Sequence, residues 1–163
     1  MFDDILDANA DYAGTFALAG ILASPKRLLA VVTCMDSRIE PLQMLGLVPG
    51  DAKIFRNAGA RITDDALRTL VLGVNLFGID RIAVIHHTDC AMTSATDDEL
   101  REKIGELRGA DASEWEFLTV SDTDAVLRAD IEKVRACPLL PDDLVVAGFL
   151  YDVDTGRVTQ VIG

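Results

Sequence analysis

The sequence predicts an α/β fold in which a mostly parallel central sheet is flanked by helices. We expect about four parallel strands and one C-terminal antiparallel strand. Short runs of β-branched and apolar residues alternate along the chain with longer amphipathic stretches, and no repeat or low-complexity run interrupts them. Half of the 163 residues are hydrophobic. A chain of this size fits one hydrophobic core, so residues 1–163 are expected to form a single domain.

The first third of the chain predicts one helix and two strands. Residues 2–20 are expected to be helical, with Ile5, Tyr12 and Phe16 near one face. Strands are expected at 27–33 and, after a turn with the sequence Val48-Pro49-Gly50-Asp51, at 52–57.

The middle of the chain has clear helix start and stop signals. Thr63 is expected to N-cap a helix that runs to about Phe77 and ends at Gly78. A strand is expected at 81–86. The sequence Thr96-Asp97-Asp98-Glu99 has the form of a capping box, so another helix is expected to begin there.

The last third predicts a helix followed by two strands. The helix covers about 123–137 and stops before Pro138, which cannot continue it. Strands are expected at 144–151 and 157–162. The turn Asp154-Thr155-Gly156 between them makes the last strand antiparallel to its neighbour.

The charge of the chain excludes two classes of partner. Fifteen Lys and Arg against 27 Asp and Glu give a net charge of −12. Nucleic acids and anionic membranes both require a basic surface, so neither is expected to bind. No stretch reaches the ~18 apolar residues of a membrane span, and the acidic start of the chain is unlike a secretory signal. We therefore expect a cytoplasmic protein.

Three chemically distinctive residues follow two of the predicted strands. Cys34 comes directly after the first strand, and His87 and Cys90 follow the third. The carboxyl ends of neighbouring parallel strands meet at one edge of a sheet, where ligands bind in α/β folds. Zn²⁺ prefers such nitrogen and sulfur ligands, and three of them leave one position open for water or substrate. The sequence predicts one Zn²⁺ per chain on these residues, although free cysteines are commonly buried apolar side chains.

The remaining cysteine and histidine are not predicted to bind the metal. Cys137 precedes Pro138 at a helix end and is interpreted as a packing residue. His86 points to the opposite face of its strand from His87 and is expected to pack or form hydrogen bonds rather than bind metal.

Two charged residues follow Cys34 closely enough to serve the predicted metal site. Asp36 and Arg38 can form a charge-assisted, bidentate pair within one loop. Such a pair can be purely structural. Beside an open zinc position, Asp36 would instead accept a hydrogen bond from metal-bound water and orient it.

Together these residues resemble the β-class carbonic anhydrases, and most closely their short prokaryotic members. The resemblance covers nearly the whole chain, and the combination of Cys-x-Asp-x-Arg with His-x-x-Cys is specific. It rests on three motifs in this order: Cys34-Met35-Asp36-Ser37-Arg38, Arg56-Asn57-Ala58-Gly59 and His87-Thr88-Asp89-Cys90.

The resemblance implies a function and roles for several residues. It implies reversible zinc-dependent hydration of CO₂ to bicarbonate, with an Asp36–Arg38 dyad and with Asp36 as a fourth zinc ligand in a closed state. It also implies that backbone near Gly59 contributes to the substrate pocket and that Lys53 lies near the site. The N-terminal helix would pack on a partner subunit, giving a homodimer or a higher homo-oligomer.

Two positions depart from the family's usual pattern. Ala91 stands where many relatives have glycine, directly after the last predicted ligand, and Ala60 follows Asn-Ala-Gly where another residue is common. The resemblance implies a pocket built for a three-atom substrate, which an added methyl group at either place would narrow.

Other functions remain open or fit less well. The same ligand set serves family members that hydrolyse carbonyl sulfide or carbon disulfide. A non-enzymatic zinc module or an inactive regulatory relative is a second class of alternative. A zinc deaminase would need a Pro-Cys-x-x-Cys motif, and a zinc dehydrogenase a Gly-x-Gly-x-x-Gly loop; the sequence has neither.

Overall fold

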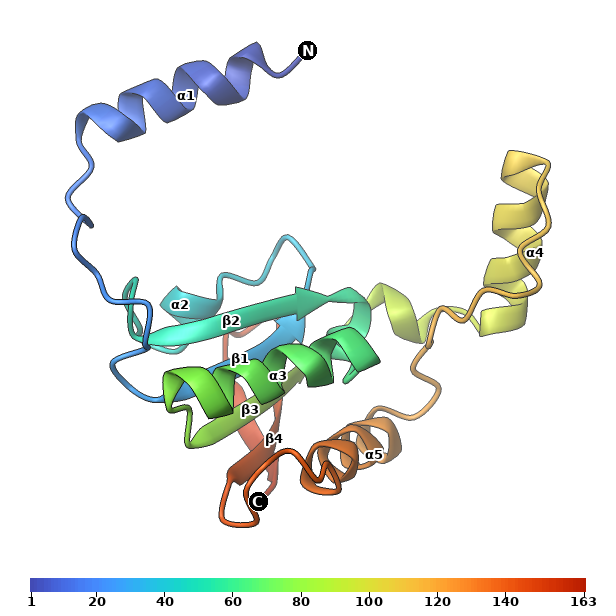
Figure 1. The fold of residues 1–163 in the computed structure, drawn as a ribbon. Helices are drawn as coiled ribbons and strands as arrows, with labels where there is room; N and C mark the ends of the chain where they lie inside the picture. The colour runs from blue at the N-terminus through green and yellow to red at the C-terminus, as the bar shows by residue number, and fades with distance from the viewer.

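The computed structural model describes all 163 residues and contains one five-stranded sheet in the order β2-β1-β3-β4-β5 (Figure 1). The first four strands are parallel, and β5 pairs antiparallel with β4. The predicted fold class is therefore confirmed. The strands are β1 Leu29–Cys34, β2 Ala52–Asn57, β3 Arg81–His87, β4 Val145–Tyr151 and β5 Val158–Ile162.

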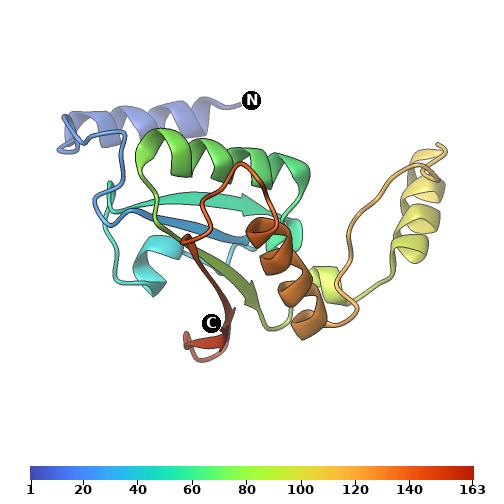
Figure 2. The same ribbon diagram turned by 60° about the horizontal axis from the view of Figure 1, so that its bottom comes forward.

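Helices cover the two faces of the sheet unequally. The longer helices α3 and α5 lie on one face, and only the short α2 lies on the other (Figure 2). Two 3₁₀ turns, η1 and η2, follow β2 and β3. The helical elements are α1 Asp3–Gly14, α2 Pro41–Met44, η1 Ala58–Ala60, α3 Asp64–Phe77, η2 Ala91–Thr93, α4 Asp97–Arg108 and α5 Thr123–Arg135.

The hydrophobic core is divided by the sheet into two clusters. The larger one packs β1, β3 and β4 against α3 and α5. The smaller one lies on the other face and includes Cys34 and Cys90 among its buried residues. The predicted metal site therefore adjoins a packed core, which holds its side chains in place.

The predicted helix caps are present. The Thr63 hydroxyl accepts a hydrogen bond from the amide of Ala66 at 3.2 Å. Gly78 ends α3 in a left-handed conformation with φ 71°, which glycine adopts without steric cost. Thr96 and Glu99 form a reciprocal capping box at the start of α4. Thr63 and Thr96 thus cap the N-termini of α3 and α4, and Gly78 ends α3, as their sequence signatures predicted.

Some predicted boundaries are wrong. The N-terminal helix ends at Gly14 rather than at residue 20, because a Gly-Thr pair of low helix propensity follows its amphipathic part. Helix α5 ends at Arg135 rather than at Cys137, and β1 begins at Leu29 rather than at residue 27. The four-residue α2 and both 3₁₀ turns were not predicted because elements this short have no readable periodicity.

Two segments stand away from the sheet (Figures 1 and 2). In the N-terminal segment, residues 1–24, every residue is exposed. In the α4 segment, residues 97–119, only Ala112 is buried. Neither these segments nor the rest of the chain contains a helix long and apolar enough to span a bilayer.

Candidate metal centre

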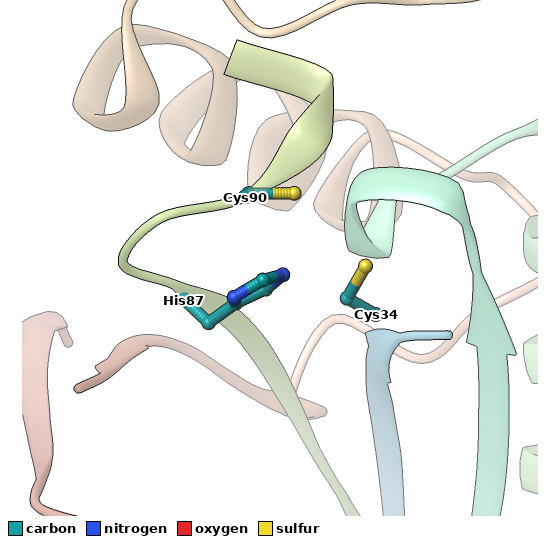
Figure 3. Close-up of side chains that lie close together, drawn as sticks. All are labelled: Cys34, His87 and Cys90. Atoms are coloured by element: carbon teal, nitrogen blue, oxygen red, sulfur yellow. The ribbon is translucent and has the colours of Figure 1, made fainter. Parts of the chain in front are cut away.

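Three side chains converge at the carboxyl edge of the sheet (Figure 3). Cys34 is the last residue of β1, His87 is the last residue of β3, and Cys90 lies just before η2. Because β1 and β3 are adjacent and parallel, their ends meet at the same edge. One donor atom from each side chain lies within 4.8 Å of the other two, and all three residues are buried. This group can hold a metal ion.

The histidine is oriented as a metal ligand would be. Its Nδ1 lies 2.8 Å from the carbonyl oxygen of Thr88. In the tautomer that donates this hydrogen bond, Nε2 is unprotonated and has a free lone pair. His87 Nε2 is buried and has no hydrogen-bond partner in the protein. A buried polar atom without a partner is costly, and coordination of a cation would satisfy it.

The two thiols differ in their readiness to ionise. Burial disfavours the Cys34 thiolate, but interactions with His87 and the amide of Gly59 outweigh it and lower the pKa of Cys34 to about 7. Burial, together with the proximity of Cys34, raises the pKa of Cys90 to about 11. Two adjacent thiolates therefore require a cation to become stable together. One imidazole and two thiolates form a donor set that suits Zn²⁺.

Asp36 and Arg38 form the bidentate pair that their spacing allows. Arg38 Nε donates to Asp36 Oδ1 at 3.0 Å, and Arg38 Nη2 donates to Asp36 Oδ2 at 2.8 Å. The backbone amide of Arg38 also donates to Oδ1 at 2.9 Å. These bonds hold the pKa of Asp36 well below its usual range, so the carboxylate stays ionised.

The sequence analysis did not assign a role to Arg56, which lies at the end of β2 beside β1. Its Nε donates to the carbonyl oxygen of Cys34 at 2.9 Å, and its Nη2 donates to that of Asp36 at 2.7 Å. Arg56 therefore fixes the backbone of the Cys34 loop. The sequence signal that could have identified Arg56 is its position directly before Asn-Ala-Gly at the end of a predicted strand.

The turn after β2 brings backbone against Cys34. The Asn57 side chain bonds to both the amide and the carbonyl of Arg61, which closes the turn. Within it, the amide of Gly59 donates to Cys34 Sγ at 3.4 Å. Gly59 has φ 74°, and a Cβ there would lie 3.3 Å from Met92 Cγ, so only glycine fits without strain. The following Ala60 is fully buried and also has a positive φ of 57°.

Lys53 is not brought together with the three side chains. It pairs in register with Ala30 near the start of β1, whereas Cys34 pairs with Asn57 at the other end. Its ammonium lies 4.6 Å from the centre of the Phe77 ring, in the geometry of a cation–π contact.

His86 and Cys137 lie on the opposite side of the sheet from the three candidate ligands. His86 is buried toward α5, and its burial lowers its pKa to about 4, so it is neutral. Cys137 is half-buried and packs against the larger core cluster. Ala91 begins η2, directly after Cys90, and is exposed.

Comparison with known proteins identifies the family. Residues 29–115 match the family model described as carbonic anhydrase. The chain is 34% identical to β-carbonic anhydrase 1 of Mycobacterium tuberculosis, over 98% of this chain and 96% of the relative. It is also 34% identical to a carbon disulfide hydrolase of Acidianus, over 98% of this chain and 90% of the relative.

A solved structure is similar to this chain in both sequence and fold. The crystal structure of a carbonic anhydrase from Streptococcus mutans superposes with a TM-score of 0.93 and is 42% identical in sequence, covering 98% of this chain and 96% of that one. The converging cysteines and histidine, the family model and these whole-length similarities lead to one conclusion: the chain belongs to the β-carbonic anhydrase family.

Proposed function

We propose that this protein catalyses the reversible hydration of CO₂ to bicarbonate and a proton, with one Zn²⁺ per chain on Cys34, His87 and Cys90. The observation that supports this best is the convergence of these three donors at the edge of the sheet. The ionised Asp36 lies in the loop that begins at Cys34, next to its bound arginine.

Each residue has a defined part in the proposed reaction. Zinc, when held there, supplies a Lewis acid that lowers the pKa of water toward neutrality. The Asp36 carboxylate accepts a hydrogen bond from the attacking water and orients it toward carbon. Arg38 makes two side-chain hydrogen bonds to Asp36 and also pairs with Asp89. Both interactions raise the pKa of Arg38 further, so Arg38 remains a cation that keeps Asp36 ionised. Gly59 contributes backbone to the substrate pocket.

Asp36 has a second proposed state. In a closed site its carboxylate would act as a fourth zinc ligand. In this structure both carboxylate oxygens accept hydrogen bonds from Arg38, so closing the site requires Asp36 to leave that arginine.

Carbon disulfide hydrolysis is the alternative reaction. It is favoured by the 34% identity to a carbon disulfide hydrolase over nearly the whole chain. The identity of 42% to the carbonic anhydrase from Streptococcus mutans favours CO₂. An inactive zinc-binding relative would share the three ligands but neither activity.

The deciding experiment measures both reactions on one zinc-replete preparation. Stopped-flow CO₂ hydration is followed with a pH indicator, and carbon disulfide hydrolysis is followed by sulfide release. We expect CO₂ hydration proportional to enzyme concentration and no sulfide above the buffer rate. Sulfide release without CO₂ hydration would establish the alternative reaction, and neither activity at full zinc occupancy would establish a non-enzymatic role.

Asp36→Asn tests whether the dyad is catalytic or only structural. Asparagine keeps the shape but can donate as well as accept, so the nucleophile would be misoriented. We expect turnover to fall about 10²-fold with zinc still bound. An Asp36→Asn protein that is zinc-replete and turns over normally would reduce the dyad to a loop ion pair.

We further propose that the N-terminal helix packs on a second copy of this chain. Its exposed apolar side chains accompany four aspartates and no basic residue. The open face of the sheet has a mostly apolar groove of about 390 Å³ whose only charged lining residues are Arg27 and Arg81. A helix that carries both acidic and exposed apolar side chains is complementary to such a groove in polarity and in charge.

A further inference from the structure

Arg38 is shared between two carboxylates, and the second belongs to a residue with no assigned role. On one side the guanidinium holds Asp36. On the other, Arg38 Nη1 donates to Asp89 Oδ2 at 2.6 Å, and Arg38 Nη2 donates to the carbonyl oxygen of Asp89 at 2.9 Å. Asp36 follows Cys34, while Asp89 lies between His87 and Cys90. One side chain therefore ties together the two loops that bear the candidate ligands.

The backbone at Asp89 is shaped for this contact. Asp89 has φ 53°, a left-handed conformation that is unfavourable for residues other than glycine and is tolerated best by Asp and Asn. Backbone strain of this kind concentrates at functional sites. The Asp89 side chain is 79% exposed, and an exposed ion pair contributes little to stability. Stability alone therefore does not account for the arrangement.

Both loops are held by backbone contacts that do not involve the Asp89 side chain. Its carboxylate is therefore not needed to fix the backbone of either loop. Arg56 fixes the carbonyls of Cys34 and Asp36. The amide of Thr88 donates to the carbonyl of Tyr151 at 2.9 Å, which ties the His87 loop to β4. What these contacts leave undetermined is the orientation of the long, half-exposed Arg38 side chain.

Resting on the function proposed above, we propose that Asp89 is a positioning residue that fixes Arg38 and, through it, the carboxylate of Asp36. A guanidinium is a rigid plane with donors on several edges. Asp89 holds the edge formed by Nη1 and Nη2, so the adjacent edge, formed by Nε and Nη2, presents its N–H groups to Asp36 in one orientation. Without Asp89, Arg38 can rotate, and Asp36 rotates with it.

The test compares Asp89→Asn with a matched control. Asparagine has the same size and tolerance for positive φ but lacks the charge that holds Arg38. The control is Asp65→Asn, which breaks another exposed Asp–Arg contact of 2.6 Å, with Arg68 on α3. We expect Asp89→Asn to lower kcat for CO₂ hydration about 10-fold and to change the visible spectrum of the Co²⁺-substituted protein. Zinc content and Tm stay as in the wild type, and the control matches the wild type throughout.

A double-mutant cycle shows whether Asp89 acts through Asp36. If it does, Asp89→Asn costs nothing further in an Asp36→Asn background, because the group it positions is already gone. Multiplicative losses, or a wild-type kcat and Co²⁺ spectrum in zinc-replete Asp89→Asn, would overturn the positioning role. Absence of CO₂ hydration in the wild type would overturn the proposed function instead, and the Co²⁺ spectrum would still report on Asp89.

Discussion

The sheet and the two projecting segments of this protein differ in how many of their residues are buried. Strand β1 has five buried residues out of six, and β3 ends in two buried histidines. Helices α1 and α4 have no buried residue at all. The candidate metal centre draws every donor from the sheet edge and none from either segment.

This difference separates two tasks. Metal binding requires donor atoms fixed to fractions of an ångström, and a packed core supplies that rigidity. A surface for a partner requires exposed apolar side chains, which a single chain leaves without cover. Changes in the sheet should therefore affect chemistry and folding, and changes in the segments should affect assembly and local order.

The largest effect is expected at the metal ligands. Cys34→Ser or Cys90→Ser replaces a thiolate by a neutral hydroxyl, so zinc binding should weaken by more than about 10²-fold and activity should be lost. The matched control is Cys137→Ser, at the half-buried cysteine away from the site. Zinc content by elemental analysis checks both. A Cys137→Ser protein as depleted of zinc as Cys90→Ser would show that the ligand assignment is wrong.

The next effect concerns assembly through the N-terminal segment. Deleting residues 1–20 removes α1 and should leave an aggregate or an unstable monomer, because the partner surface loses its cover. In the full chain, Ile5→Asp should weaken the dimer measured by light scattering. Leu139→Asp, at a residue of similar exposure outside this segment, should not. A well-behaved, fully active monomer after the deletion would contradict the proposed interface.

A pair of glycines compares the two regions directly. A Cβ at Gly148 in β4 would lie 2.6 Å from Ile131 Cδ1 and 3.1 Å from Leu127, whereas a Cβ at Gly14 in α1 would meet nothing within 4 Å. Gly148→Ala should destabilise the protein by about 1–3 kcal/mol. Gly14→Ala should change stability by less than about 1 kcal/mol. Urea unfolding of both variants measures this, and equal losses would remove the distinction between the regions.

The smallest effect is a local pH response in the α4 segment. Asp97 accepts backbone hydrogen bonds from Thr119 and Phe117, which lower its pKa from 3.8 to about 2. Its stabilising contribution is therefore complete above pH ~4 and is lost as the pH falls through about 2. The only tryptophan, Trp115, lies in this segment and reports on it by fluorescence.

The control for this response is a neighbouring carboxylate. Asp97→Asn should show at neutral pH the Trp115 emission that the wild type reaches only near pH 2, while circular dichroism of the sheet stays unchanged. Asp98→Asn, at an exposed side chain in the same helical turn, should behave as the wild type. Wild-type emission from Asp97→Asn at every pH would show that Asp97 does not hold the segment.

Sequence reasoning succeeded where a signal was local. The Thr63 cap and the Gly78 stop bracket α3 as predicted, because both depend on a few neighbouring residues. The Cys34, His87 and Cys90 group was identified because its members follow strands that a parallel sheet places side by side. The end of α1 was missed because Phe16 continues the apolar spacing of Ile5 and Tyr12, whereas the Gly14-Thr15 pair of low helix propensity ends the helix.

Side-chain contacts between residues far apart in the sequence were harder to predict. The pairing of Arg38 with Asp89, 51 positions away, depends on the turn between His87 and Cys90 and on the positive φ of Asp89. Arg56 belongs to the motif Arg56-Asn57-Ala58-Gly59, but its hydrogen bonds to the Cys34 loop depend on strand register. Such side-chain directions follow from the assembled fold, and no spacing along the chain encodes them.

The most direct test of the account is restoration of activity by zinc. The protein is stripped with a chelator, zinc is added back in steps, and stopped-flow CO₂ hydration is measured with bound zinc on each sample. We predict that the rate rises in proportion to occupancy and saturates at one Zn²⁺ per chain. Full activity in the stripped protein, or no CO₂ hydration at one zinc per chain, would contradict it.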